Sequence, residues 1–184
     1  MILVVAATEK ELAASGAADT FCCGIGPAES GVRTATALAE SRPDAVLHVG
    51  IAGAAELPPL SVVIGTEAFY SDIVDPASQM PRVERVYPAP GLVEAAARVL
   101  PDAHLLPITS CARVGGGGLC DVEAMEGFSV LRAAELAGVP AIEVRTVSNR
   151  PEDVDRSVWR IGDALHRLGE IVPLLVDELA PAVR

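Results

Sequence analysis

Positive charge and aromatic side chains are both scarce in this sequence. Lys10 is its single lysine, and 14 Lys and Arg stand against 25 Asp and Glu, which gives a formal net charge of -11. Affinity for a phosphate backbone comes from clustered Lys and Arg, so a chain of this charge repels nucleic acid. Three Phe, two Tyr and one Trp also provide few platforms on which single-stranded bases could stack. Nucleic acid is therefore not an expected partner.

Long apolar runs and metal-site spacings are missing as well. No segment reaches the roughly 20 apolar residues of a membrane span, and no basic region precedes the apolar first residues, which we interpret as a buried strand rather than a signal peptide. Cys22, Cys23, Cys111 and Cys120 show neither C-x-x-C nor Cys/His zinc spacing. We therefore expect no metal, no cofactor, reduced thiols and a cytoplasmic protein with no membrane partner.

The 184 residues, 51% of them hydrophobic, are enough for one core, and we expect a single domain over residues 1–184. Residues 2–7 are apolar on both alternations, which is typical of a parallel strand covered on both faces. Strand patterns of this kind alternate along the chain with helical patterns, which predicts an α/β fold. Further strands are predicted at 21–25, 44–49, 60–70, 104–110, 122–125 and 141–148. Helices are predicted after Thr8, at 28–41, at 92–100, from Glu126, and from near Asp153, with a long surface loop at 76–90.

Residues 121–149 read as strand, helix and strand. Residues 122–125 can end a short strand, Glu126 opens a helix, and Gly138 stops it. The strand that follows delivers Asn149 to its carboxyl end. Ligands of open α/β sheets lie beyond the carboxyl ends of strands, so we expect Glu126 and Asn149 to face one cavity.

Two motifs in this stretch carry a resemblance to a known family. The Met-Glu-Gly turn at 125–127 and the Arg-x-x-Ser-Asn segment at 145–149 resemble the purine-nucleosidase branch of the nucleoside phosphorylase and nucleosidase superfamily. Asp155, Arg156 and Trp159, which follow, make the chain most similar to the futalosine hydrolases of menaquinone biosynthesis. The resemblance implies a three-layer sandwich around a mixed, mostly parallel sheet, in shortened form.

The first helix has two interpretations. Thr8 and Glu11 have the spacing of a capping box, in which the glutamate reaches back to the N-cap. The resemblance instead implies that Glu11 is the carboxylate that activates water, with Glu9 as the alternative.

The resemblance also implies the residues that hold the sugar. Met125 would pack against it, Glu126 would accept hydrogen bonds from the ribose hydroxyls, and Arg145 would pair with Glu126 or another carboxylate. A small-residue turn would lie beside the ribose and base. Its members are Gly50, Ile51, Ala52 and Gly53. Ile51 departs from the hydroxyl residue that the family usually has there.

Asn149 is the candidate that reads the base. Adenine-specific relatives have Asp here, whereas the amide of Asn can donate to a 6-oxo group and accept from a protonated N7. This pattern matches hypoxanthine. The alternative is an Asn that caps the last helix.

Three other segments are interpreted as structural. The Gly-Ile-Gly-Pro turn at 24–27 lacks the third glycine of a dinucleotide fingerprint, and we interpret it as helix packing. The resemblance implies that the glycines at 115–118 bridge a deletion, which removes a base-stacking residue that relatives have. Phe128 could replace that residue or simply belong to the core. The apolar stripe of the last helix predicts packing on the sheet, with a kink at Pro173.

The implied reaction is hydrolysis of futalosine to hypoxanthine and dehypoxanthine futalosine. The alternatives are a methylthioadenosine/S-adenosylhomocysteine-type nucleosidase, a purine nucleoside phosphorylase, and a non-catalytic nucleoside-binding protein. Relatives commonly form homo-oligomers, so the resemblance implies one here. Its only other expected partner is the small-molecule nucleoside substrate.

Overall fold

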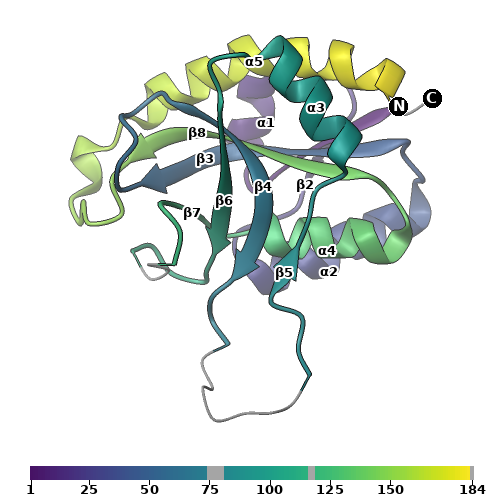
Figure 1. The fold of residues 1–184 in the computed structure, drawn as a ribbon, viewed down its shortest axis with the longest axis horizontal. Helices are drawn as coiled ribbons and strands as arrows, with labels where there is room; N and C mark the ends of the chain where they lie inside the picture. The colour runs from purple at the N-terminus through teal and green to yellow at the C-terminus, as the bar shows by residue number, and fades with distance from the viewer. Residues whose placement is uncertain (74–80, 116–118, 183–184) are drawn as a thin grey trace.

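A mixed sheet with helices on both faces organises residues 1–73, 81–115 and 119–182, which the computed structural model describes (Figure 1). The strands are β1 (Ile2–Ala6), β2 (Thr20–Cys22), β3 (Ala45–Ala54), β4 (Val62–Tyr70), β5 (Arg85–Val86), β6 (His104–Ser110), β7 (Val122–Ala124) and β8 (Ala141–Asn149). Their order is β2-β1-β3-β7-β6-β4-β5, with β8 pairing both β3 and β4. Most pairs are parallel, while β3–β7, β4–β5 and β4–β8 are antiparallel. The predicted three-layer fold is confirmed.

The helices divide between the two faces of the sheet. They are α1 (Glu9–Ser15), α2 (Pro27–Glu40), α3 (Pro90–Val99), α4 (Gly127–Ala137), the 3-10 helix η1 (Arg156–Val158) and α5 (Ile161–Ala182). Helices α1, α3 and α5 lie on one side of the sheet, and α2 and α4 lie together on the other (Figure 1). No helix in these described ranges is long and apolar enough to cross a membrane.

Two apolar clusters hold these layers together. The larger one joins Val4, Leu47 and Val144 of the central strands to Leu168 and Leu175 of α5. The apolar stripe of the last helix therefore packs on the sheet, as predicted. A second cluster lies between the sheet and α2 and α4. Burying a large aliphatic side chain of this kind contributes about 1.5–3 kcal/mol.

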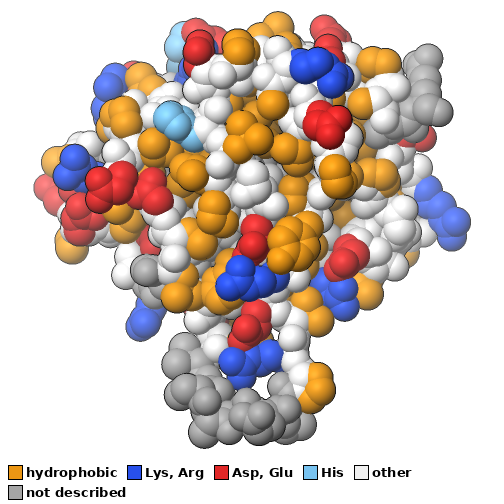
Figure 2. All heavy atoms as spheres, viewed as in Figure 1, with side chains coloured by type: hydrophobic (Ala, Val, Ile, Leu, Met, Phe, Trp, Pro, Cys, Tyr) orange, Lys and Arg blue, Asp and Glu red, His pale blue; other side chains and the backbone are white. Residues whose placement is uncertain are grey.

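Charged side chains remain outside these clusters, and several of them form ion pairs. Around the edge strands, Arg85 pairs with Glu67 and Arg82 with Glu84. Figure 2 shows such acidic and basic side chains next to each other on this face.

Local sequence signals set several boundaries. Helix α4 ends at Gly138, whose φ of 70° is the left-handed conformation that glycine adopts without a Cβ penalty. Thr8 caps α1 with both hydrogen bonds of the capping box. These predicted signals are confirmed.

Four boundary predictions are wrong. The segment 50–54 is not a turn but the end of β3, because β8 pairs with it as far as Asn149. The loop predicted at 76–90 contains β5, and Pro90 already lies in the first turn of α3, where proline is well tolerated. The last helix begins at Ile161 rather than near Asp153. Pro173 lies inside this helix, and the kink expected there stays a prediction.

Candidate active site

A cavity of about 460 Å³ collects most of the predicted site residues. Residues that follow β1 and β7, the last residues of β3, and Asn149 at the end of β8 all line it. Glu126 and Asn149 face this one cavity, as predicted, but the strands that carry them do not run the same way. Strand β8 is parallel to β3 and β7 is antiparallel to it. Strand β7 pairs with Gly53 and Ala54 at the end of β3 and runs back along it, and Glu126, which follows β7, lines the cavity.

Glu11 is 6% exposed and lines the cavity from the first turn of α1. Its Oε2 accepts the Thr8 N–H at 3.0 Å and the Thr8 hydroxyl at 2.7 Å. Its Oε1 accepts the Ile51 N–H of β3 at 3.1 Å. A carboxylate offers about four lone-pair positions, so these three bonds fix the group and leave room for one further donor. Glu9 is exposed and does not line the cavity.

Gly50 is the residue against which this carboxylate rests. A Cβ at that position would lie 2.6 Å from Glu11 Oε1 and 2.3 Å from Arg145 Nη1. Only glycine leaves space for both side chains there. Gly50 therefore backs the site without lining the cavity.

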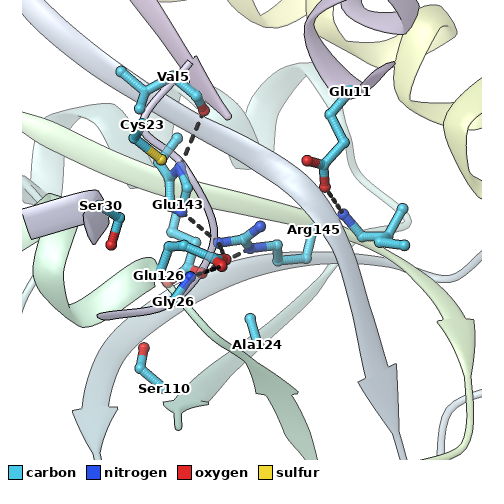
Figure 3. A network of polar contacts seen from close by, with 12 residues as sticks. Val5, Glu11, Cys23, Gly26, Ser30, Ser110, Ala124, Glu126, Glu143 and Arg145 are labelled. Atoms are coloured by element: carbon cyan, nitrogen blue, oxygen red, sulfur yellow. Dashed lines mark hydrogen bonds and ion pairs between the residues drawn. The ribbon is translucent and has the colours of Figure 1, made fainter. Parts of the chain in front are cut away.

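Arg145 lies behind the cavity and is 1% exposed. Its Nε donates to Glu143 Oε1 at 2.8 Å, and its Nη2 lies 4.0 Å from Glu126 Oε2. The same Nη2 also contacts His48 Nε2. Figure 3 shows Glu126 and Glu143 next to this guanidinium, while the carboxylate of Glu11 on α1 bonds to the β3 backbone. Arg145 therefore lies beside carboxylates, as predicted.

Glu126, 5% exposed, is held from two directions. Its Oε1 accepts the Gly26 N–H at 2.9 Å, and Arg145 lies on the other side. Burial raises the pKa of Glu126, and the guanidinium and the Gly26 N–H only partly oppose this effect. The carboxyl group therefore has a strong need for a hydrogen-bonding partner in the cavity.

His48 is fully buried and is the neutral member of this network. Burial lowers its pKa well below 6.5, and the positive charge of Arg145 lowers it further. Its Nδ1 lies 3.0 Å from the Val5 carbonyl, so Nδ1 carries the proton and Nε2 accepts from Arg145. Burial also lowers the pKa of Arg145, but Glu143, Glu126 and Glu11 outweigh that effect and raise it.

Asn149 is 5% exposed and its side chain is oriented by its neighbours. Oδ1 accepts the Ser148 hydroxyl at 2.7 Å, and Nδ2 donates to the Arg150 carbonyl at 2.9 Å. One amide hydrogen and one carbonyl lone pair remain for a ligand. Asn149 does not cap the last helix, because α5 begins at Ile161.

The structure brings most of the predicted set together. The predicted residues that line the cavity are Glu11, Ile51, Ala52, Gly53, Met125, Glu126 and Asn149. Gly50 and Arg145 lie directly behind it. Phe128 does not line it; its ring stacks on Tyr70 at 5.1 Å and packs against a core cluster. Most of the predicted deletion at 115–118 lies outside the described residues.

Several contributors were missed by sequence reasoning. The turn at 24–27 is more than helix packing, since Gly26 holds Glu126 and Ile25 lines the cavity. Glu123 also lines it, and its Oε1 accepts the Gly115 N–H at 2.6 Å. Further lining residues that no motif marked as binding are Thr8, Lys10, Cys111, Arg113, Arg156 and Trp159. The described residues contain no group of three His, Cys, Asp or Glu able to hold a metal ion.

Comparison with known proteins agrees with this architecture. Residues 20–112 match the model of the Phosphorylase superfamily. The chain is 35% identical to a futalosine hydrolase of Streptomyces coelicolor in an alignment that covers 85% of this chain and 79% of the relative.

Solved structures share the fold at lower identity. A futalosine hydrolase mutant of Helicobacter pylori superposes with a TM-score of 0.86 at 16% identity, covering 96% of this chain and 98% of that one. A 5'-methylthioadenosine/S-adenosylhomocysteine nucleosidase of Neisseria meningitidis superposes with a TM-score of 0.80 at 21% identity, covering 97% of both chains. The chain belongs to the phosphorylase superfamily and, within it, to the futalosine hydrolase family.

Proposed function

We propose that this protein is a nucleosidase that hydrolyses the N-ribosidic bond of futalosine and releases hypoxanthine. One observation carries the proposal: Glu11, Glu126 and Asn149 arrive from three different elements and line a single cavity. The 35% identity to a futalosine hydrolase supports the choice of substrate.

Glu11 is the proposed general base. One lone-pair position remains on its carboxylate, which suits a water molecule directed at the anomeric carbon. As the C1′–N9 bond breaks, its electron pair leaves with the base, which takes up a proton from solvent at N7, and the water oxygen bonds to C1′. Glu11 takes the proton released by the water.

Glu126 and Met125 are the proposed ribose contacts. The buried Glu126 carboxylate would accept hydrogen bonds from the sugar hydroxyls, and Met125 would pack against the ring. The cavity segments of β3, Ile51 to Gly53, would lie along the ribose and base. Arg145 would keep Glu126 in place from behind.

Asn149 is the proposed contact to the leaving base. Its free amide hydrogen would donate to the 6-oxo group, and its carbonyl would accept from the protonated N7 of hypoxanthine. A methylthioadenosine/S-adenosylhomocysteine-type activity is the second candidate, because nucleosidases of that name share the fold. A 6-amino group would place a donor against the amide donor of Asn149, which disfavours this candidate.

A phosphorylase reaction fits the cavity poorly. Glu11, Glu123 and Glu126 all line it, and two like charges about 4 Å apart cost roughly 4 kcal/mol at an effective dielectric constant near 20. This repulsion opposes a phosphate dianion and favours water as the nucleophile.

The proposed biological setting follows the same family. We place the reaction in menaquinone biosynthesis in the cytoplasm, and we propose a homo-oligomer because relatives commonly assemble near their active sites.

A single assay tests the proposal. Purified protein is incubated with futalosine, with and without phosphate, and released hypoxanthine is measured by chromatography. We expect equal release in both conditions. Release only with phosphate would indicate a phosphorylase, and hypoxanthine binding without any release would indicate a non-catalytic binding protein.

A further inference from the structure

A third carboxylate lines the cavity and has no role in the reaction described so far. Glu123 lies on β7, three residues before Glu126, and is 7% exposed. Removing a carboxylate from water is unfavourable unless polar groups meet it. Glu11 and Glu126 serve water and ribose in the proposed reaction, which leaves Glu123 for another part of the ligand.

The register of the sheet places Glu123 and Asn149 on either side of one residue of β3. Gly53 pairs with Glu123 on β7 and with Asn149 on β8. A Cβ at Gly53 would lie 3.3 Å from Asn149 Nδ2 and 3.6 Å from Glu123 Cγ. Both side chains therefore flank the face toward which a Gly53 side chain would point. Because glycine has no side chain, the space between the amide and the carboxylate stays open to the cavity, which all three residues line.

Glu123 is oriented by the segment that follows β6. Its Oε1 accepts the Gly115 N–H at 2.6 Å. Gly115 has a φ of 66°, and a Cβ there would lie 2.9 Å from the Pro151 carbonyl oxygen, so this position requires glycine. A carboxylate has about four acceptor positions and no donor. The bond to Gly115 therefore fixes the group, and what the group offers a ligand is an acceptor.

The base proposed for this cavity has a donor that Asn149 does not meet. Hypoxanthine carries a hydrogen on N1, beside its 6-oxo group, whereas the proposed contacts of Asn149 are to that oxo group and to N7. A 6-aminopurine has no hydrogen on N1, and its N1 lone pair is an acceptor. An acceptor placed beside N1 therefore favours a 6-oxopurine and opposes a 6-aminopurine.

We propose that Glu123 is a specificity-determining residue that accepts the N1–H of a 6-oxopurine base lying over Gly53. Asn149 would contact the O6 and N7 edge of the same base from β8, so the two side chains hold the base from either side. This inference rests on the proposed function, because the base must occupy the end of β3 for N1 to reach Glu123. It adds a discrimination at N1 to the one that Asn149 makes at the 6-position.

The first test is the ratio of kcat/KM for futalosine to kcat/KM for aminodeoxyfutalosine. In the wild type this ratio should exceed about 100. Glu123→Ala should lower it about tenfold or more, because the hydrogen bond to the charged group is lost on futalosine and never formed on the 6-amino substrate. Glu123→Gln should keep more of the ratio than Glu123→Ala, since its amide carbonyl still accepts.

Glu56→Ala is the matched control, because Glu56 is an exposed glutamate just beyond β3 that does not line the cavity. It should leave the ratio unchanged, and melting curves of all variants check that they fold. Equal losses of kcat/KM on both nucleosides in Glu123→Ala would overturn the N1 contact and leave Glu123 as an anchor for Gly115. The proposed function would stand in that case, since the wild type still cleaves futalosine.

Binding of free bases tests the same contact without turnover. The wild type should bind hypoxanthine at least about tenfold more tightly than 1-methylhypoxanthine in calorimetry, and Glu123→Ala should lose most of that preference. Equal binding of the two bases by the wild type would overturn the contact. If the wild type cleaved neither nucleoside, the proposed function would fail, and the difference in base binding would still decide whether Glu123 reads N1.

Discussion

The Oε1 atom of Glu11 accepts the N–H of Ile51 at 3.1 Å, and this bond ties the first turn of α1 to strand β3. The other oxygen of the same carboxylate completes the capping box with Thr8. Capping and catalysis were alternative interpretations of Glu11 in the sequence. The geometry is compatible with both at once, because a helix cap can hold a carboxylate rigidly at the edge of a cavity.

Glu11→Gln should therefore keep the fold and lose hydrolysis. Glutamine at the third helical position still supports a capping box, but an amide cannot accept a proton from water. We expect kcat to fall by at least about 100-fold, the usual contribution of a positioned base, while hypoxanthine binding measured by calorimetry stays near the wild-type value.

Glu9→Gln is the control for this experiment, because Glu9 is an exposed glutamate in the same helical turn. It should leave kcat within about twofold of wild type, since surface substitutions of this kind usually change little. Near-wild-type turnover of Glu11→Gln would reduce Glu11 to a capping residue.

Glu126→Ala should discriminate between sugars. The buried carboxylate is oriented by Gly26 and Arg145, and we propose that its remaining oxygen positions accept from the ribose hydroxyls. We expect kcat/KM to fall about 10- to 150-fold on ribosides, as for other hydrogen bonds to charged groups, and much less on 2′-deoxyribosides. Equal losses on the two substrate types would leave Glu126 with a structural role only.

The turns and the ends of helices and strands around the site could be predicted from neighbouring residues in the sequence. The Met-Glu-Gly turn, the Gly138 stop and the strand ending at Asn149 were read correctly, because caps and alternation depend on neighbouring residues. The direction of β7 was not, since pairing with β3 is a long-range property. The same reason explains why the hydrogen bond from Gly26 to Glu126, across 100 positions, was missed.

The buried network behind the cavity was also only half predicted. Arg145 was expected beside a carboxylate, but its partner Glu143 lies two residues away on the same strand, a spacing that carries no helical or capping signal. No motif in the sequence marked His48. Only the parallel pairing of β3 and β8 brings His48 opposite Glu143.

His48 should make stability depend on pH. Its pKa in the folded protein lies well below the ordinary 6.5. Below pH 6.5 the unfolded chain therefore protonates His48 more readily than the folded protein does. This contribution to stability is complete above pH 6.5 and is lost as the pH falls below it, by up to about 1.4 kcal/mol per pH unit. Urea unfolding of wild type and His48→Gln between about pH 5 and pH 7.5 measures the slope, which should be shallower in the variant.

His166→Gln provides the matched control, because that histidine is on the surface with 82% of its side chain exposed. Its pH slope in the same window should equal that of the wild type. A wild-type slope that survives in His48→Gln would place the titrating group elsewhere.

Asn149→Asp should reverse the choice of base. In the wild type, one amide hydrogen of Asn149 remains after the bond to the Arg150 carbonyl, and it suits the 6-oxo group of hypoxanthine. A protonated aspartate would instead donate to N7 and accept from a 6-amino group. Sites built on buried hydrogen bonds can discriminate by factors of about 10⁴, so the ratio of kcat/KM for futalosine and aminodeoxyfutalosine should fall strongly in the variant. Asn149→Ala is the control and should lose activity on both substrates. If Asn149→Asp kept the wild-type preference, Asn149 would not contact the base.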